Sequence, residues 1–175
     1  MKNEFKTRKE IRMKNFDYSR NGLYFITICT KDRIPYLCTI CDDSVYVGAD
    51  IIRPIVNLTK TGNMTEYSMN QINKHYDDVN VLKYCIMPDH IHIIISIMHD
   101  INTADCGRII SAPTIPKIIG SFKRYVSKNT GIKLWQKSYY DHIIRNEKEF
   151  LEICDYIDNN PLNWINNKFN LNKWR

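Results

Sequence analysis

The amino-acid sequence predicts an α+β fold in which helices pack on a central antiparallel β-sheet. Short apolar segments rich in β-branched and aromatic residues alternate with segments of helical periodicity, in the order strand, helix, strand, strand, helix. The two consecutive strands, expected at residues 79–87 and 90–98, are separated only by Pro88 and Asp89, which favours an antiparallel hairpin. The 175 residues correspond to one ordinary domain, without an internal repeat or an interdomain linker.

In the first half of the chain, a strand and a helix are expected on either side of an irregular segment. Residues 23–30 read LYFITICT, and their β-branched and aromatic side chains predict a buried strand. Residues 31–55 are expected to be irregular because proline and glycine interrupt them. A helix is expected from about residue 57 to residue 76, where apolar residues recur with a rough helical period.

The middle of the chain is expected to contribute the hairpin, a loop, a second helix and a fourth strand. The hairpin strands are expected at residues 79–87 (VNVLKYCIM) and 90–98 (HIHIIISIM). Residues 99–113 are expected to form a loop, followed by a basic helix from residue 116 to about residue 129. Residues 140–145 are expected to be extended.

The clearest helix is expected from residue 147 to about residue 160, because its apolar residues recur at spacings of three and four. Asn160 precedes Pro161, and a residue before proline disfavours the α conformation, so the helix is expected to end there. Residues from about 165 to 175 are then expected to be a short polar tail.

The composition is that of a globular protein with a moderate excess of positive charge. Hydrophobic residues make up 43% and charged residues 25%, which argues against an intrinsically disordered chain. The formal net charge of +6 permits binding to nucleic-acid phosphates without establishing it. The basic residues of segment 1–20 indicate either a solvated N-terminus or a basic arm on a phosphate backbone. They are Lys2, Lys6, Arg8, Lys9, Arg12, Lys14 and Arg20.

A cytoplasmic protein without membrane contact is expected. No apolar run approaches the length of a membrane span, and the charged start of the chain lacks the apolar core of a secretory signal. The six cysteines are expected to be reduced. Cys38 and Cys41 form a C-x-x-C pair, but no second ligand pair with zinc spacing accompanies it, so a structural role is favoured.

His90 and His92 open the strand expected at residues 90–98. Side chains alternate between the two faces of a strand, so both imidazoles point to one face while Ile91 points to the other. Two imidazoles on one face suit a single divalent metal ion. The spacing alone fits two ordinary histidines on a solvated face at least as well.

Tyr156 and Asn160 are four residues apart in the last expected helix, so they are neighbours on its surface. Both lie at the edge of the apolar stripe, from which a side chain reaches the rim of the sheet. Asn160 offers a carbonyl oxygen, a ligand that suits Mg²⁺ or Mn²⁺, and Tyr156 offers a phenol. The spacing alone also fits a hydrogen-bonded tyrosine and an asparagine that caps the helix.

Several segments together resemble one family of enzymes. The run CIMPDHIHIIISI resembles the histidine–hydrophobic–histidine segment of single-tyrosine transposases. The greatest similarity is to the REP-associated tyrosine transposases, relatives of the transposases of the smallest bacterial insertion sequences. The resemblance extends from about Asp17 to Trp164 and includes FDYSRNGLYFITICT, GSFKRYVSK, LWQKSYYDHIIRNEKEF and YIDNNPLNW.

The resemblance implies a ferredoxin-like fold and a metal-dependent enzyme that cuts single-stranded DNA and transfers the strand. Tyr156 would be the nucleophile and would form a 5′-phosphotyrosine intermediate. His90, His92 and Asn160 would hold Mg²⁺ or Mn²⁺. The expected substrate is a hairpin or REP-like DNA with a foot of unpaired bases. The whole chain, residues 1–175, would be one nuclease domain, a monomer or a homodimer, associated with the nucleoid through DNA.

Alternatives remain open for several residues. Tyr139 and Tyr140 compete with Tyr156 as the nucleophile, and packing or DNA contact is favoured for both. The expected DNA-binding residues are Arg8, Lys9, Arg12, Lys123, Arg124, His142 and Arg145. Unpaired bases are expected to stack on Tyr18, Tyr24, Tyr125 and Trp135, which are each individually more typical of core or surface. The main alternative function is a non-catalytic or regulatory binder of nucleic-acid hairpins, and a second is a phosphoesterase that uses metal-activated water.

Overall fold

A four-stranded antiparallel sheet forms the centre of the molecule. The computed structural model describes residues 17–46, 52–99 and 113–169. The strand order is β4-β5-β1-β6, and every neighbouring pair is antiparallel. The strands are β1 (Gly22–Cys29), β4 (Val79–Ile86), β5 (His90–Ile97) and β6 (Tyr140–Ile144). The predicted hairpin of β4 and β5 is confirmed.

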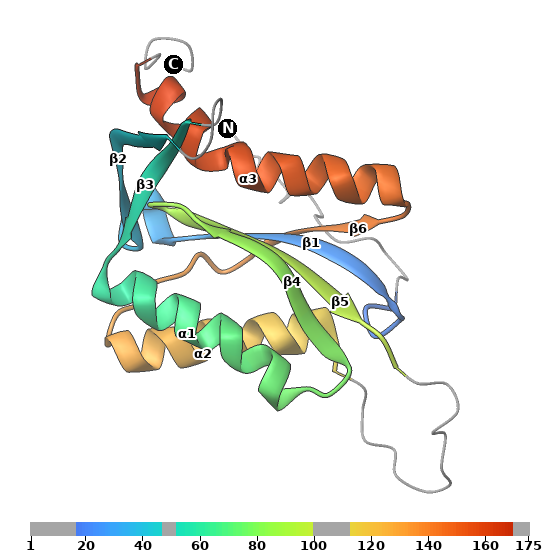
Figure 1. Ribbon diagram of the computed structural model, residues 1–175. Coiled ribbons are helices and arrows are strands. Elements are labelled where there is room, and N and C mark those ends of the chain that lie inside the picture. Colours follow the sequence, from blue (N-terminus) through green and yellow to red (C-terminus); the bar gives the residue numbers. More distant parts are fainter. Residues whose placement is uncertain (1–16, 47–51, 100–112, 170–175) are drawn as a thin grey trace, which may run out of the picture.

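Helices cover both faces of this sheet. Helices α1 (Lys60–His75) and α2 (Ile115–Thr130) lie on one face, and α3 (Glu147–Phe169) lies on the other (Figure 1). Two helices on one face of a sheet with this strand order make a ferredoxin-like arrangement, so the predicted α+β sandwich is confirmed. Among the described residues, no helix combines the length and apolar character that crossing a membrane requires.

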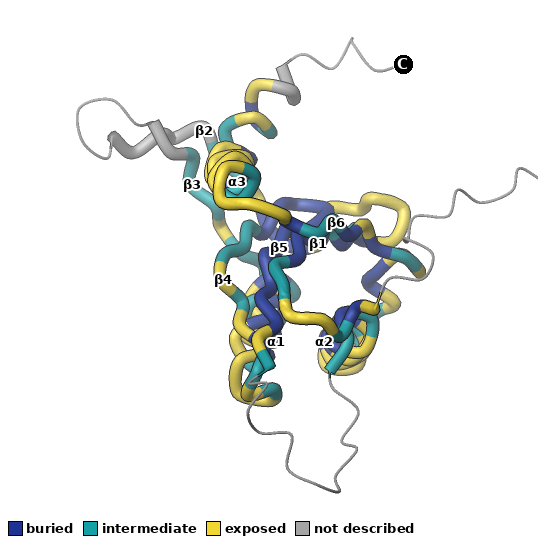
Figure 2. Tube along the Cα trace, turned by 90° about the vertical axis from the view of Figure 1, so that its right-hand side faces the viewer, coloured by how far each residue is buried: buried dark blue, intermediate teal, exposed yellow. Residues whose placement is uncertain are grey.

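Strand β5 is buried along its whole length because it has a covered surface on both sides. Ile91, Ile93, Ile95 and Ile97 belong to the core that includes buried residues of α1 and α2, whereas Ile94 belongs to a smaller core that includes residues of α3. Figure 2 shows the buried residues concentrated in the central strands. The two histidines therefore lie on an enclosed face, not on the solvated one that the alternative interpretation required.

The prediction that residues 31–55 are irregular was wrong for residues 38–46 and 52–55, which form strands. Strands β2 (Cys38–Tyr46) and β3 (Ile52–Leu58) form a separate antiparallel ribbon. Its register shifts between Cys41 and Val45, and Pro54 of β3 lies opposite this irregularity. A proline is compatible with the ribbon there because a bulge does not require its missing backbone N–H. Residue 57, where the helix was expected to begin, therefore lies within β3, and α1 begins only at Lys60.

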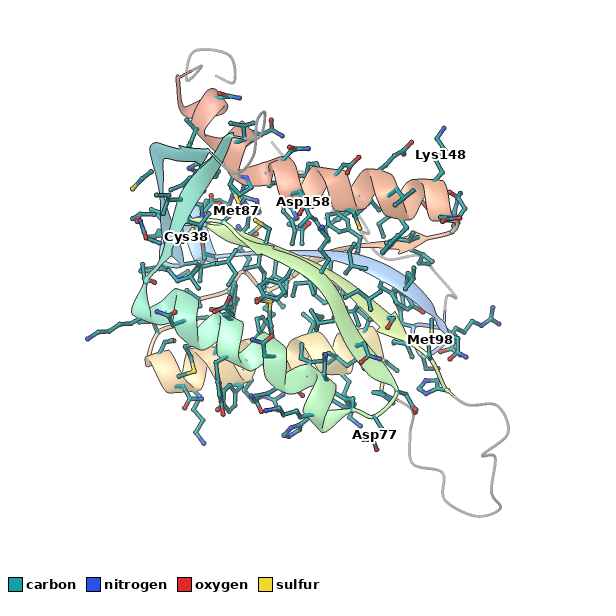
Figure 3. All side chains as sticks on the ribbon, viewed as in Figure 1. Cys38, Asp77, Met87, Met98, Lys148 and Asp158 are labelled. Carbon is teal, nitrogen blue, oxygen red and sulfur yellow. The ribbon has the colours of Figure 1, made fainter. Side chains whose placement is uncertain are left out.

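Helix α3 does not end at Asn160, as the sequence had indicated, but continues through Pro161 to Phe169. A proline inside a helix costs about 3 kcal/mol through a lost hydrogen bond and a steric clash. Tertiary packing offsets this cost, because Ile165 is buried and the Trp164 ring lies 6.0 Å from the His90 ring. Asp158, labelled in Figure 3, further ties α3 to β4 through an ion pair of 2.7 Å with Lys83. The first residues of the expected polar tail are therefore helical.

Gly62, in the first turn of α1, is expected to be intolerant of any side chain. A Cβ atom there would lie 2.0 Å from the backbone oxygen of Leu37. That oxygen accepts from the Thr59 N–H at 2.9 Å, and the Leu37 N–H donates to the Pro88 oxygen at 3.0 Å. These two hydrogen bonds keep the Leu37 backbone from moving away from a new side chain. Gly62→Ala is expected to lower the free energy of unfolding by about 3 kcal/mol. Urea denaturation measures this change.

Gly120 in α2 is the matched control, because a Cβ atom there would meet nothing within 4 Å. Gly120→Ala is expected to raise the free energy of unfolding by about 0.5–1 kcal/mol, the usual gain for alanine over glycine inside a helix. Equal stability of the two alanine variants would contradict the close contact between α1 and Leu37.

Candidate active site

The side chains of His90 and His92 converge on the α3 face of the sheet. Both are buried, and their Nε2 atoms are 3.1 Å apart. The opposite ring nitrogen of each also has a partner. His90 Nδ1 lies 2.6 Å from Asp89 Oδ1, and His92 Nδ1 lies 2.8 Å from Thr27 Oγ1. A carboxylate on Nδ1 of His90 favours a proton there, which leaves the Nε2 lone pair directed toward His92.

The register of β1 against β5 produces this arrangement. Thr27 is the cross-strand partner of His92, and Cys29 is the partner of His90. Asp89 belongs to the tight turn that precedes β5, and its second oxygen lies 3.0 Å from Arg33 Nε. Imidazoles that bind a metal are usually oriented by such partners on their other nitrogen. The donor set of the pair thus fits a divalent cation.

Burial chiefly lowers the pKa of His92, to about 3, and the nearby positive charges of His90 and Arg33 add to the effect. His92 is therefore neutral at physiological pH. A neutral imidazole with a free lone pair is the form that binds metals.

Tyr156 of α3 lies over the histidines. Its hydroxyl oxygen is 3.4 Å from His92 Nε2. Its ring makes an edge contact with His92 and another with Phe25, at centroid distances of 5.2 and 6.1 Å. The side chain nevertheless remains 47% exposed, so a ligand from solvent can reach the phenol. The structure thus brings together the predicted phenol and the predicted imidazole pair.

Asn160 lies one helical turn beyond Tyr156, and Trp164 lies one turn beyond Asn160. Tyr156 contacts His92 and Trp164 contacts His90, so Asn160 stands between two residues that face the histidine pair. Asn160 is buried, and its Nδ2 donates to the Tyr156 backbone oxygen at 3.2 Å. Within the part of the chain that the structure describes, no group of three or more His, Cys, Asp or Glu side chains fits a metal ion. Asn160 could add an amide oxygen as a ligand beside the two imidazoles.

His90, His92 and Tyr156 line an open cleft of about 580 Å³, which we call the histidine–tyrosine cleft. Its walls are formed by Phe25, Thr27, Cys29, Arg33, His90, His92, Gln136, Tyr140 and Tyr156. Tyr140 is half exposed there, whereas Tyr139 is buried in the main hydrophobic core, which includes residues of α1 and α2. Tyr140 is consequently the one of the two competing tyrosines that can meet a substrate in this cleft.

The structure places the predicted DNA-binding residues in different surroundings. Lys123 Nζ donates to the backbone oxygens of Gln136, Lys137 and Ser138 at 2.5, 3.3 and 3.4 Å, so it supports the loop that borders the cleft. Arg124 is exposed on α2, on the opposite side of the sheet from α3. Arg8, Lys9 and Arg12 lie outside the described residues.

The aromatic residues expected to stack on bases are mostly core residues. Tyr18, Tyr24 and Trp135 are buried in the main hydrophobic core, and only Tyr125 of this set is exposed. The burial of these three rings agrees with the core role that was more typical of each residue individually, and it removes them as stacking surfaces for bases.

The C-x-x-C pair has a structural setting. The Cys38 side chain is buried, and Sγ donates to the Ile86 backbone oxygen at 3.3 Å (Figure 3). Burial raises the pKa of this thiol to about 12, assisted by Cys85 and Asp89. A thiol held protonated is a poor nucleophile and a poor metal ligand. This setting agrees with the structural role favoured by the sequence.

Sequence reasoning missed two partners of the histidines, Asp89 and Thr27, and also Arg33, which pairs with Asp89. A carboxylate directly before an H-x-H pair was a usable signal for Asp89. Thr27 becomes visible only once the register of β1 against β5 is known. Arg33 required knowledge of how the segment after β1 turns back toward the β4–β5 turn.

His142 and Arg145 meet the start of α3. His142 Nε2 lies 2.6 Å from Glu149 Oε1, and the Arg145 backbone N–H donates to Glu149 Oε2 at 2.7 Å. The bond from Arg145, followed by the bond from His142, lowers the pKa of Glu149 below its ordinary value of 4.5. Both residues thus position the helix that carries Tyr156, and their expected contact with phosphate stays a prediction.

The lowered pKa of Glu149 predicts a pH-dependent contribution to stability. Its ionised form is favoured in the folded state, so the contribution is complete above the ordinary pKa and is lost as pH falls through the lowered value. Glu149→Gln is expected to reduce the melting temperature at pH 7 but not at a pH low enough to protonate the Glu149 carboxylate in the folded protein. Glu152→Gln, on the same helix with only a 3.9 Å pair to Lys148, serves as the control. A pH-independent difference between Glu149→Gln and the wild type would contradict this contribution.

The fold and the site together define a class of α+β proteins. In this class, a pair of histidines on a central strand faces a tyrosine on a covering helix. Residues 53–160 match the model of the IS200-like transposase family, and the chain belongs to this family of enzymes that act on DNA.

Individual relatives agree with this assignment. An uncharacterized Haemophilus influenzae protein is 34% identical over 173 residues, covering 90% of this chain and 89% of its own. A second protein of that organism, named as a REP-associated tyrosine transposase, is 29% identical over 152 residues, covering 83% and 73%. The fold is similar to the solved structure of a REP-associated tyrosine transposase bound to a REP hairpin. That similarity has a TM-score of 0.60 at 18% identity and covers 87% of this chain and 73% of the other.

Proposed function

We propose that this protein is a metal-dependent tyrosine transposase that cleaves single-stranded DNA and joins it to another strand. The observation that carries the proposal is the distance of 3.4 Å between the Tyr156 hydroxyl and Nε2 of His92. His92 is neutral, and its neighbour His90 is oriented by Asp89. The phenol therefore lies beside two imidazole nitrogens in an accessible cleft, as a nucleophile next to a bound cation would.

His90, His92 and Asn160 would hold a divalent cation, Mg²⁺ or Mn²⁺. Asp89 contacts Nδ1 of His90, and Thr27 contacts Nδ1 of His92, so both imidazoles are oriented through the nitrogen that would not bind the ion. This orientation supports the assignment. The buried amide of Asn160, one turn from Tyr156, supplies a hard oxygen donor. When bound, such an ion supplies charge neutralisation and orientation for the scissile phosphate.

The chain's own residues account for the covalent chemistry. The Tyr156 oxygen attacks phosphorus, a phosphorus–oxygen bond to the phenol forms, and the bond to the 3′-oxygen breaks. The phenol proton leaves to water at the open side of the cleft, and the released 3′-oxygen takes a proton from water. The products are a 5′-phosphotyrosine and a 3′-hydroxyl. Because the covalent link retains the energy of the broken bond, joining to a new 3′-hydroxyl requires no ATP.

Hairpin DNA with unpaired bases is the proposed substrate. Two relatives are named for REP-associated transposases, and one of these was solved with a REP hairpin. The net charge of +6 favours a polyanion. The half-exposed Tyr140 ring, which lines the cleft together with Tyr156, would stack on an unpaired base.

The test is to incubate the protein and Mn²⁺ with DNA hairpins that carry single-stranded feet and a label at the 3′ end, the end that stays on the fragment joined to tyrosine, and to run a denaturing gel. A labelled protein–DNA adduct is the expected result. A hairpin that binds without being cut would indicate the non-catalytic binder. Cleavage without an adduct would indicate a phosphoesterase that uses metal-activated water.

A further inference from the structure

Arg33 belongs to a turn with an unusual backbone conformation. In the short helix η1 (Lys31–Arg33), Asp32 and Arg33 have φ values of 56° and 57°. Residues other than glycine rarely adopt this left-handed region, because the Cβ atom crowds the backbone. On either side, the N–H groups of Thr30 and Leu37 donate to Asp89 and Pro88 at 2.9 and 3.0 Å, which holds the turn in place. Strain maintained by surrounding contacts is typical of functional sites.

The guanidinium of Arg33 has protein partners at Nε and Nη1 and is open at Nη2. Its Nε lies 3.0 Å from Asp89 Oδ2, and its Nη1 donates to Cys29 Sγ at 2.8 Å. Among the residues that the structure describes, Nη2 has no protein partner. The side chain is 49% exposed and lines the histidine–tyrosine cleft.

Arg33 is connected to the histidine pair through a single carboxylate. Asp89 contacts Arg33 through Oδ2 and His90 through Oδ1, the latter at 2.6 Å. The guanidinium is thus fixed relative to the two imidazoles. Among the described residues that line the cleft, Arg33 is the one whose side chain carries a permanent positive charge.

We infer that Arg33 is a further catalytic residue, whose open guanidinium edge contacts a non-bridging oxygen of the scissile phosphate. This inference rests on the proposed function. As the Tyr156 oxygen bonds to phosphorus and the 3′-oxygen departs, negative charge is distributed over the phosphate oxygens. A donor already fixed by Asp89 stabilises that charge without having to reorganise. The planar guanidinium can contact a carboxylate and a phosphate at once, which the single amino group of lysine does less well.

The first experiment measures the rate of adduct formation in a single turnover, with Mn²⁺ and a pool of hairpins whose single-stranded foot is randomised. Arg33→Gly is expected to be slower by about 100-fold or more, and Arg33→Lys by about 10-fold. Glycine tolerates the positive φ, so Arg33→Gly should melt no lower than Arg33→Ala. The control Lys31→Ala removes one exposed charge two residues away, and its rate should stay within about 3-fold of wild type.

The second experiment separates phosphate contact from mere positioning of His90. Once the cleaved linkage is mapped, one of its non-bridging oxygens is replaced by a methyl group, in each stereoisomer. A guanidinium that acts on that charge loses its advantage on a neutral linkage. The rate ratio of wild type to Arg33→Gly should then fall from about 100 to below about 5 for at least one stereoisomer. A positioning role would leave the ratio unchanged.

The results distinguish two kinds of failure. If the wild-type protein forms an adduct and Arg33→Gly forms it equally fast, Arg33 is not catalytic, and the proposed function stands. An unchanged ratio on both methylated stereoisomers likewise overturns the phosphate contact alone. If the wild-type protein forms no adduct with any hairpin of the pool, the proposed function fails, and the role of Arg33 fails with it.

Discussion

Tyr156→Phe is expected to abolish the covalent protein–DNA adduct, with a rate at least about 10⁴-fold below wild type. The substitution removes only the hydroxyl oxygen, the atom that lies 3.4 Å from His92 Nε2. The ring contacts with Phe25 and His92 remain, so the helix should keep its position. The measurement is the yield of labelled adduct on a denaturing gel.

Tyr140→Phe is the matched control, because Tyr140 is the other half-exposed tyrosine of the cleft. It should still form the adduct, and both variants should bind the hairpin as well as the wild-type protein does. Mass spectrometry of the wild-type adduct should locate the modified peptide in α3. An adduct that persists in Tyr156→Phe and disappears in Tyr140→Phe would move the nucleophile to β6.

The second large effect is expected for His92. His92→Gln is expected to slow adduct formation by about 100- to 1,000-fold and to weaken Mn²⁺ binding by about 10- to 100-fold. Glutamine cannot place a nitrogen lone pair 3.1 Å from His90 Nε2 while its other end meets Thr27. Adduct rates at several Mn²⁺ concentrations, together with titration calorimetry of Mn²⁺, measure both changes.

His75 provides the control for this variant, because it is an exposed histidine on α1, on the opposite side of the sheet. His75→Gln should match wild type in both assays. Hairpin binding measured without metal should be similar in all the proteins, since the imidazoles are proposed to act on the scissile linkage. Full activity of His92→Gln, or full activity of the wild-type protein in a chelator, would remove the case for a metal at this site.

Local periodicity was sufficient to predict the strands of the central sheet. It also showed which candidate site residues share a face within one strand or helix. Alternation along a strand placed His90 and His92 on one face, and the four-residue spacing placed Tyr156 beside Asn160. Neither pattern contains a distance between the strand and the helix. The resemblance to a family of transposases connected them, and the packing of α3 over β5 brings the phenol near the imidazoles.

Two wrong expectations concern prolines. Pro161 was expected to end the last helix, yet burial of Ile165 and contact between Trp164 and His90 extend it, so packing outweighs a local preference of about 3 kcal/mol. Pro54 was expected to lie in an irregular segment, yet it lies opposite a shift of register in a paired ribbon, where its missing N–H is not required.

The sequence by itself determined the α+β class, the order of most elements and which side chains share a face within each element. Short-range spacing carries that information, because side-chain direction follows the backbone period. Only the tertiary structure decided that Asp89, Thr27 and Arg33 surround the histidines, and that Tyr18, Tyr24 and Trp135 are core residues. These contacts join residues that lie far apart in the chain or in adjacent turns, so they depend on strand register and on packing between layers.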